Sequence, residues 1–247
     1  MTKIFIFGIS GKMGRALLSR AKELNCEITG GFDVVPHESV PTFTDVKKVN
    51  VQFDAVIDFS RPETLDSVIA LAKERHCPAV LCTTGYDEKA NEKIKALSKS
   101  VPVFKSGNMS VGMNVLISLA EQATKLLWDS SDVEIIEAHH NKKVDAPSGT
   151  AKMIADAVNK TADNQANFVY SRYGTDCKRK KGDVGISAIR GGTIVGEHEV
   201  MFCLNDEIVT IKHSALSRNI FADGALRAAQ FLLDKSPAMY DMRDMLK

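Results

Sequence analysis

The chain has 247 residues and a formal net charge of +1, from 32 lysines and arginines against 31 aspartates and glutamates. Hydrophobic residues make up 44% and charged residues 26%, a composition typical of globular proteins that excludes a disordered or collagen-like chain. The balanced charge gives no reason to expect nucleic acid or a membrane surface as a partner, and no apolar run approaches the roughly 18 residues that span a bilayer. At roughly 100–200 residues per domain, the length predicts one large domain or two smaller ones.

Five cysteines are scattered along the chain, at Cys26, Cys77, Cys82, Cys177 and Cys203. Their odd number and the absence of a CxxC pair argue against a disulfide framework and a zinc site. The apolar run at the N-terminus ends at Gly8 and is too short for a signal peptide. We therefore expect reduced thiols, a cytoplasmic location and no metal.

Short apolar runs alternate with stretches of helical period over the first hundred residues. The predicted strands are Ile4–Phe7, Ile28–Phe32, Ala55–Phe59, Ala79–Cys82 and Val101–Phe104, and the predicted helices are Met13–Leu24, Glu63–Arg75 and Asp87–Leu97. Strands that alternate with helices favour βαβ units, and uniformly apolar strands are typical of a sheet that helices cover on both faces.

The pattern changes after Asn108. A helix is predicted over Val111–Leu127, another after Pro147–Thr150, and a final one over Ile220–Leu233. The strand-like segments of this half are Val133–Ala138, Val184–Arg190, Ile194–Phe202 and Ile208–His213. The polar stretch Thr161–Lys181 is interpreted as a mobile loop. Its basic run, Lys178–Lys181, is more often a solvated surface than a binding site. The expected α/β fold is a Rossmann-like doubly wound parallel sheet plus a second α+β domain with a mostly antiparallel or mixed sheet.

A glycine-rich loop directly follows the first predicted strand and opens the first helix. Gly8, Gly11 and Gly14 give a tight turn that brings backbone N–H groups at a helix N-terminus towards a pyrophosphate. Asp33 lies 19 residues after Gly14, at about the position of the acidic residue that holds the adenosine ribose in dinucleotide-binding proteins. A plain βα turn and a capping aspartate are the alternatives, but the strand before and the helix after favour dinucleotide binding.

Two further loops follow predicted strands, at Asp58–Pro62 and Cys82–Gly85. Ligands of open α/β sheets bind at the carboxyl ends of the strands, and small hydroxylated residues there suit a cofactor. The same residues could equally be helix N-caps.

A dense cluster of charged and titratable residues occupies Glu137–Ala151. His139 and His140 are neighbours on a predicted strand, so their side chains should point to opposite faces, which argues against both binding one metal. Each histidine could instead have a purely structural role.

The same segment contains a candidate anion site. Lys143 carries a positive charge, and Ser148 can cap a helix whose first N–H groups, from Gly149 and Thr150, attract an anion. Together with the histidines these groups predict a receptor for a small dicarboxylate, with proton donors in place. A surface salt-bridge cluster is the alternative.

The segment Glu137–Ala151 resembles, nearly position for position, the signature of the 4-hydroxy-tetrahydrodipicolinate reductase (dihydrodipicolinate reductase) family. The resemblance covers nearly the whole chain and is weakest over Asn159–Lys181. Its other motifs are Gly8–Gly14, Asp58–Pro62, Thr83–Gly85, Asn108–Asn114, Arg190–Gly192 and Val195–His198.

This resemblance implies an NADH- or NADPH-dependent reduction in the diaminopimelate route to lysine. The substrate would be the cyclic imine that forms when hydroxy-tetrahydrodipicolinate loses water, and the product tetrahydrodipicolinate. His139 matches the proton donor/acceptor, Lys143 a proton donor and His140 a substrate-binding position, while Gly149 and Thr150 match the backbone site for a substrate carboxylate. The implied cofactor-binding residues are Gly8, Ile9, Ser10, Gly11, Lys12, Met13, Asp33, Cys82, Thr83, Thr84, Ser106, Gly107, Asn108 and Met109.

The resemblance also implies a domain plan. The last helix would return to the cofactor domain, giving a dinucleotide-binding domain of residues 1–107 and 220–247 and a substrate-binding and oligomerisation domain of residues 108–219. Members of the family are usually homotetramers built through the sheet of the second domain, so we expect a homotetramer here.

Three positions depart from the pattern of many relatives. Val34 stands where an arginine commonly follows the acidic residue, Cys82 stands where glycine is common, and Ser106–Gly107 replaces an alanine-containing pair. The first departure favours NADH over NADPH, because a 2′-phosphate would lie near Asp33 with no cation from Val34 to offset the repulsion. Lys12 or Arg15 could recover part of that loss.

Two other functions remain open. An aspartate or homoserine dehydrogenase-like enzyme would share the fold but lacks the run from His139 to Thr150. A non-catalytic dinucleotide sensor would explain Gly8–Gly14 but would not need His139 and Lys143.

Overall fold

The computed structural model describes all of residues 1–247. The chain forms two compact units, one of Met1–Val111 with Arg218–Lys247 and the other of Gly112–Ser217. None of its helices combines the length and the apolarity that a membrane crossing requires.

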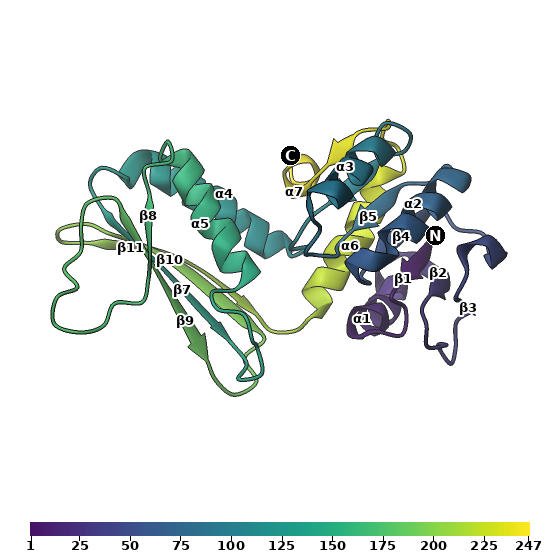
Figure 1. Cartoon of the computed structure of the whole chain (residues 1–247), viewed down its shortest axis with the longest axis horizontal. Coiled ribbons are helices and arrows are strands. Elements are labelled where there is room, and N and C mark those ends of the chain that lie inside the picture. Colours follow the sequence, from purple (N-terminus) through teal and green to yellow (C-terminus); the bar gives the residue numbers. More distant parts are fainter. The chain divides into compact units, whose positions relative to one another are not determined.

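The first unit is built on a seven-stranded sheet in which every neighbouring pair is parallel (Figure 1). Its strands in spatial order are β12 (Met239–Tyr240), β6 (Val103–Lys105), β5 (Ala79–Leu81), β4 (Ala55–Asp58), β1 (Thr2–Phe7), β2 (Cys26–Phe32) and β3 (Thr42–Phe43). The chain runs outward from β1 to one edge and from β4 to the other, so the strand order switches between these two central strands. This confirms the predicted doubly wound sheet. The two-residue edge strands β3 and β12 are too short to leave a pattern in the sequence.

Alternate residues of β1 supply the two cores of this unit. Ile4 and Ile6 pack with residues of helices α1 and α6, while Phe5 and Phe7 pack with residues of α2 and α3. Both faces are therefore apolar, which explains why the strands show no polar alternation. The helices are α1 (Lys12–Ala21), α2 (Leu65–Glu74), α3 (Glu88–Leu97), α6 (Asn219–Leu232) and α7 (Met242–Met245), with short 3₁₀ turns η1 (Lys22–Leu24), η2 (Val46–Lys48) and η3 (Pro62–Thr64).

The second unit contains a five-stranded mixed sheet. Its strands in spatial order are β11 (Ile208–Ala215), β10 (Gly196–Cys203), β7 (Asp132–His139), β9 (Asp183–Arg190) and β8 (Asn167–Tyr170). The pairs β11–β10 and β10–β7 are antiparallel, whereas β7–β9 and β9–β8 are parallel. Helices α4 (Val111–Leu127) and α5 (Gly149–Thr161) pack on one face of this sheet, which confirms the predicted second α+β domain with a mixed sheet.

The interpretation of Thr161–Lys181 as a loop is wrong in part. It contains β8, a four-residue edge strand whose apolar run Phe168–Tyr170 lies among polar residues and was not recognised. Within the basic run, Lys178, Lys180 and Lys181 are exposed as expected. Arg179 is only partly exposed, because it forms ion pairs with Asp132 and Glu134 and donates to the Val133 carbonyl over 3.0 Å. A planar guanidinium can satisfy several acceptors at once, which a count of basic residues does not reveal.

Candidate active site

Loops after four parallel strands of the first unit meet at one edge of the sheet. They follow β1, β4, β5 and β6, and they carry most of the predicted cofactor-binding residues. In an open α/β sheet this carboxyl edge, near the switch in strand order, is where a dinucleotide binds.

The glycine loop needs glycine for two physical reasons. Gly8 has φ +83°, and a Cβ there would lie 2.8 Å from the Phe59 carbonyl oxygen. A Cβ on Gly14 would lie 2.1 Å from the carbonyl oxygen of Ile9, so α1 can approach the strand only with glycine there. Gly11 is the N-cap of α1 and has no side chain to occupy the first N–H groups, which suits an anion at this helix start.

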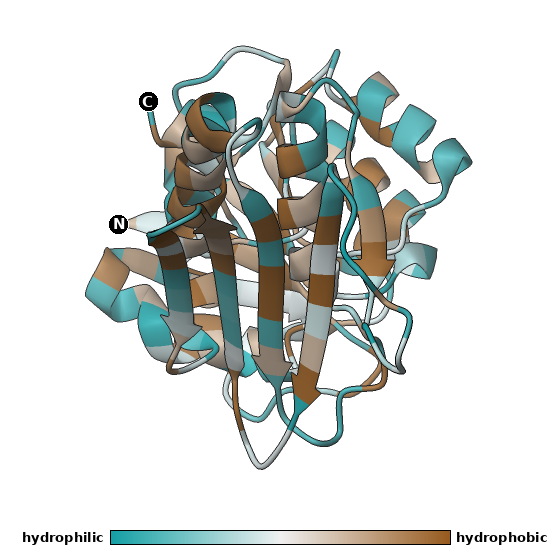
Figure 2. Ribbon diagram, turned by 90° about the vertical axis from the view of Figure 1, so that its left-hand side faces the viewer, coloured by the Kyte–Doolittle hydropathy of each residue, from teal (hydrophilic) through white to brown (hydrophobic).

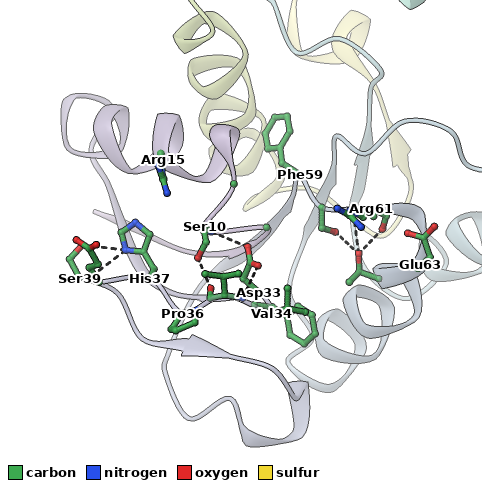
Figure 3. A pocket seen from close by; sticks show the side chains of 17 residues that line it. Ser10, Arg15, Asp33, Val34, Pro36, His37, Ser39, Phe59, Arg61 and Glu63 are labelled. Atoms are coloured by element: carbon green, nitrogen blue, oxygen red, sulfur yellow. Dashed lines mark hydrogen bonds between the residues drawn. The ribbon is translucent and has the colours of Figure 1, made fainter. Parts of the chain in front are cut away.

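A cavity of about 1090 Å³ opens beside this loop (Figure 3). Gly8, Ser10 and Gly11 line it, and so does Asp33, which directly follows β2 and lies beside Ser10. One Asp33 carboxylate oxygen accepts from the Ser10 N–H (3.0 Å) and the other from the Val35 N–H (3.2 Å). Because a carboxylate offers about four acceptor sites, Asp33 can accept these two backbone hydrogen bonds and still accept from ribose hydroxyls. The residues present therefore fit a dinucleotide.

The structure does not gather every predicted cofactor residue around this cavity. Ile9 is fully buried, so only its backbone can reach a ligand, and Met13 packs against the core. The predicted residues that do not line the cavity are Ile9, Lys12, Met13, Cys82, Thr83, Thr84, Ser106, Gly107, Asn108 and Met109. Their part in cofactor binding stays a prediction.

The other lining residues are not among the cofactor-binding residues that the resemblance implies. They are Arg15, Phe32, Val34, Val35, Pro36, His37, Glu38, Ser39, Phe59, Ser60, Arg61, Glu63 and Thr64. The loop Asp58–Pro62 was singled out for its position after a strand, whereas His37 and Ser39 belong to the turn between β2 and β3, which carries no sequence motif.

In the second unit, His139 lies at the end of β7 with its Nδ1 2.7 Å from an oxygen of Glu137. The two residues are two positions apart, so they share the helix-covered face of the sheet. Glu137 is fully buried and His139 is 12% exposed. An ionised carboxylate only accepts, so in the neutral ring Nδ1 carries the proton and Nε2 keeps its lone pair.

Glu137 is held as a carboxylate by several donors. Arg190 binds it with both terminal nitrogens, at 2.6 and 2.7 Å, and the Ser148 N–H donates over 2.9 Å. Burial alone would raise the pKa of Glu137, but the hydrogen bonds from Arg190, His139 and Ser148 outweigh it and bring that pKa below its ordinary value. The carboxylate is therefore ionised at neutral pH.

The N-terminus of α5 lies next to this group. Ser148 is its N-cap, and its hydroxyl accepts from the Ala151 N–H over 3.1 Å. A Cβ built on Gly149 meets no atom within 4 Å, so the start of the helix at Gly149 borders open space. The helix dipole favours an anion there.

Lys143 lies in the turn between β7 and α5, where its Nζ is 2.9 Å from a carboxylate oxygen of Asp145. The Lys143 ammonium, by hydrogen bonding, lowers the pKa of Asp145. The backbone N–H of Lys143 donates to the His140 carbonyl over 3.1 Å, which places both residues in one turn. Because exposed ion pairs are worth roughly 0–1 kcal/mol, a substrate carboxylate can replace Asp145 at Lys143 at little cost.

His198 was not predicted as a site residue. It is 4% exposed, its Nε2 is 3.1 Å from the Ser148 hydroxyl, and its ring centre is 5.2 Å from that of His139. It lies on β10 directly across from Glu137. Burial, followed by repulsion from His139, lowers the pKa of His198 to about 4. It is therefore a neutral packing partner of the site near pH 7.

The low pKa of His198 gives a testable dependence of stability on pH. In the unfolded chain His198 becomes protonated as the pH falls below 6.5, the ordinary pKa of histidine. In the folded chain it becomes protonated only near pH 4. We expect the free energy of unfolding to fall across this window by up to roughly 3 kcal/mol from this residue. In urea denaturation at several pH values, His198→Gln, which keeps an amide near Ser148 but does not titrate, should flatten the dependence. An unchanged slope in this variant would contradict the assignment.

Comparisons with known proteins cover the whole chain. The family model described as dihydrodipicolinate reductase, N-terminus, matches residues 2–109, and the one described as dihydrodipicolinate reductase, C-terminus, matches residues 112–246. A 4-hydroxy-tetrahydrodipicolinate reductase of Caldanaerobacter subterraneus subsp. tengcongensis is 45% identical over 250 aligned residues, covering 100% of this chain and 99% of the relative. One of Clostridium novyi is 43% identical over 250 residues, with the same two coverages.

Solved structures show the same fold at low identity. The dipicolinate-bound dihydrodipicolinate reductase from Paenisporosarcina sp. TG-14 has a TM-score of 0.80 at 20% identity, covering 98% of this chain and 97% of that one. Aspartate dehydrogenase from Thermotoga maritima has a TM-score of 0.53 at 16% identity, covering 96% and 98%. The fold alone therefore does not separate these two activities.

A doubly wound parallel sheet with a glycine loop, joined to an α+β unit, defines the class of two-unit, dinucleotide-binding oxidoreductases. Within that class, the two family models and the relatives at 45% and 43% identity show to which family the chain belongs. The chain belongs to the dihydrodipicolinate reductase family, as the resemblance of Glu137–Ala151 predicted. Membership supports a pyridine nucleotide as the cofactor and a small molecule as the substrate.

Proposed function

We propose that the chain reduces 4-hydroxy-tetrahydrodipicolinate, through dihydrodipicolinate, to tetrahydrodipicolinate in the diaminopimelate route to lysine. The observation that carries the proposal is His139, bonded to a buried carboxylate, beside Lys143 and the open N-terminus of α5. A proton donor next to a cationic anion site suits the reduction of a small dicarboxylate imine.

The nicotinamide, when bound, supplies the hydride. Addition of hydride to a conjugated imine leaves an enamine-like anion, which must take up a proton. His139 and Lys143 are the groups that we assign to deliver it. Gly149, Thr150 and His140 bind the substrate, the first two through backbone N–H groups aimed at a carboxylate.

One coupled assay tests the proposal. Substrate generated by the preceding synthase, mixed with this protein and NADH or NADPH, should give a loss of reduced-coenzyme absorbance. Aspartate offered with the oxidised coenzyme should give none. If the protein bound coenzyme but reduced nothing, and pyridine-2,6-dicarboxylate produced no thermal shift, a dinucleotide sensor would be the better account.

We propose that NADH is the preferred coenzyme. Two unit charges about 5 Å apart, at an effective dielectric of about 20, repel by roughly 3 kcal/mol, and a 2′-phosphate near Asp33 meets such repulsion. Val34 offers no cation, although Arg15 lines the cavity and can offset part of the effect. We expect NADH to be favoured by roughly 3–30-fold in kcat/KM, each factor of ten being about 1.4 kcal/mol.

Three variants sharpen this coenzyme test. Val34→Arg should narrow the gap between NADH and NADPH, and Arg15→Ala should widen it. Lys12→Ala should widen it less, because Lys12 does not line the cavity. Steady-state kinetics with both coenzymes at one ionic strength decide the matter, and equal or better kcat/KM with NADPH in the unmodified protein would contradict the preference.

We also propose a homotetramer formed through the sheet of the second unit. Figure 2 shows a face of this sheet with no helix in front of it. It presents Ile136, Ile189, Met201 and Ile208, and Ile189 and Ile208 are more than half exposed. An apolar face of this kind is commonly covered by association, and closed symmetry suits a tetramer. Light scattering should show four times 27.0 kDa, and particles of only 27.0 kDa would contradict the proposal.

A cytoplasmic location is the last part of the proposal. All five cysteines are unpaired, and three of them, Cys26, Cys77 and Cys82, are buried. Burial raises the pKa of the Cys77 thiol to about 12, so it acts as a small apolar side chain. Free thiols in these numbers suit a reducing compartment.

A further inference from the structure

Glu137 connects three parts of the second unit through one buried carboxylate. It accepts four hydrogen bonds, from the His139 ring, from the two terminal nitrogens of Arg190, and from the backbone N–H of Ser148. These donors belong to the end of β7, the end of β9 and the start of α5. All four contacts come from donors, two at each oxygen, so the negative charge of the carboxylate is stabilised at both oxygens.

Arg190 extends this connection to the turn that carries Lys143. The same Nη2 atom that binds Glu137 at 2.6 Å also donates to the carbonyl oxygen of Asp145 at 2.7 Å. Asp145 in turn holds the Lys143 ammonium through its side chain. Arg190 therefore fixes the backbone of the turn that carries Lys143, and Arg190 is oriented by Glu137.

We propose that Glu137 is the positioning residue of the reductase site. It holds His139 with the proton on Nδ1, so that Nε2 is the atom that exchanges a proton with the substrate, and through Arg190 it places the turn of Lys143. In the doubly protonated ring, Nε2–H gives its proton to the substrate anion, and the ring returns to the neutral Nδ1–H form while Glu137 stays ionised. This inference rests on the proposed function for the reaction, but the tautomer of His139 can be measured without any substrate.

The substitution Glu137→Gln tests this role, because glutamine has nearly the same shape but replaces one accepting oxygen with a donating NH₂ group. Its amide has one accepting oxygen, whereas both oxygens of Glu137 face donors. If the amide NH₂ faces His139, it donates to Nδ1 and forces the proton onto Nε2. If it faces Ser148 instead, it repels that N–H, and in either orientation Arg190 loses a hydrogen bond. For Glu137→Gln we expect kcat to fall by roughly 10²–10⁴-fold, with a smaller change in KM.

The decisive measurement is the nitrogen-15 NMR spectrum of the histidine rings. The chain has six histidines, and the signals of His139 are those lost in His139→Gln. In the unmodified protein, the neutral ring of His139 should carry its proton on Nδ1 and not on Nε2. In Glu137→Gln the protonated Nε2 form should appear in the orientation in which the amide NH₂ faces His139. An Nε2–H ring in the unmodified protein would overturn the proposal, whether or not Glu137→Gln folds and whatever the substrate is.

A second arginine–carboxylate pair offers a matched control. Arg20 binds Asp223 through two nitrogens, at 2.8 and 3.2 Å, in the first unit. Asp223→Asn removes one charge from that pair, and it should leave kcat within about twofold and the His139 signals unchanged, as expected for a residue outside the reacting groups. An equal loss of kcat in Asp223→Asn and Glu137→Gln, with His139 unaltered in both, would show that Glu137 acts only through general stability.

Discussion

Replacing His139 with alanine is expected to lower kcat by roughly 10²–10⁴-fold, the usual worth of a positioned acid or base. The ring is held by Glu137 and is only 12% exposed, so its loss removes an oriented proton donor that water cannot replace in the same geometry. Coenzyme affinity should hardly change, because the cavity that fits a dinucleotide contains no residue of the second unit. Steady-state kinetics and a coenzyme titration measure the two effects separately.

Lys143→Ala should lower kcat by a similar factor of roughly 10²–10⁴ and should also raise KM, since the substrate carboxylate loses its cation. Lys142→Ala is the matched control, because Lys142 is the neighbouring lysine and is exposed. It should leave both constants within about twofold, as surface substitutions usually do. Near-normal turnover in a folded His139→Ala or Lys143→Ala protein would show that the assigned roles are wrong.

The sequence predicted those parts of the site that are local in the chain. His139, Lys143 and Ser148 lie within one short segment, and the capping position of Ser148 follows from the residue type alone. Arg190 and His198 were missed as site residues because they reach the site through sheet pairing. Arg190 is opposite His139 in the parallel β7–β9 register, and His198 is opposite Glu137 in the antiparallel β7–β10 register. Both residues lie in motifs of the family resemblance, but the strand register that brings them to His139 and Glu137 cannot be deduced from a single sequence.

Glu137 shows a second limit of the sequence. As one glutamate of a charged cluster it carries no sign that it is fully buried, since glutamate is rarely buried without a partner. The partner, Arg190, is 53 positions away. The fold was easier to predict, because apolar strands and helical periods are local patterns. The strands that were not predicted are the two-residue β3 and β12 and the isolated four-residue β8.

The second large effect is expected for Gly14→Ala, which should lower the free energy of unfolding by about 3 kcal/mol or more. The added Cβ would lie 2.1 Å from the Ile9 carbonyl oxygen and 2.5 Å from the Gly8 carbonyl oxygen. Both atoms belong to the backbone of the glycine loop, so no side-chain rotation relieves the contact. The helix α1 must move away from the strand, and the loop that follows β1 must move with it.

Urea denaturation followed by circular dichroism measures this loss, and a coenzyme titration of the folded fraction should show weaker binding by at least about tenfold, because the N–H groups of the loop no longer converge. Gly191→Ala is the control, since a Cβ there meets no atom within 4 Å. Its free energy of unfolding should stay within about 0.5 kcal/mol of the unmodified protein. Equal stability of the two variants would mean that α1 can shift without cost. In that case the close approach at Gly14 would not be the reason for glycine in the loop.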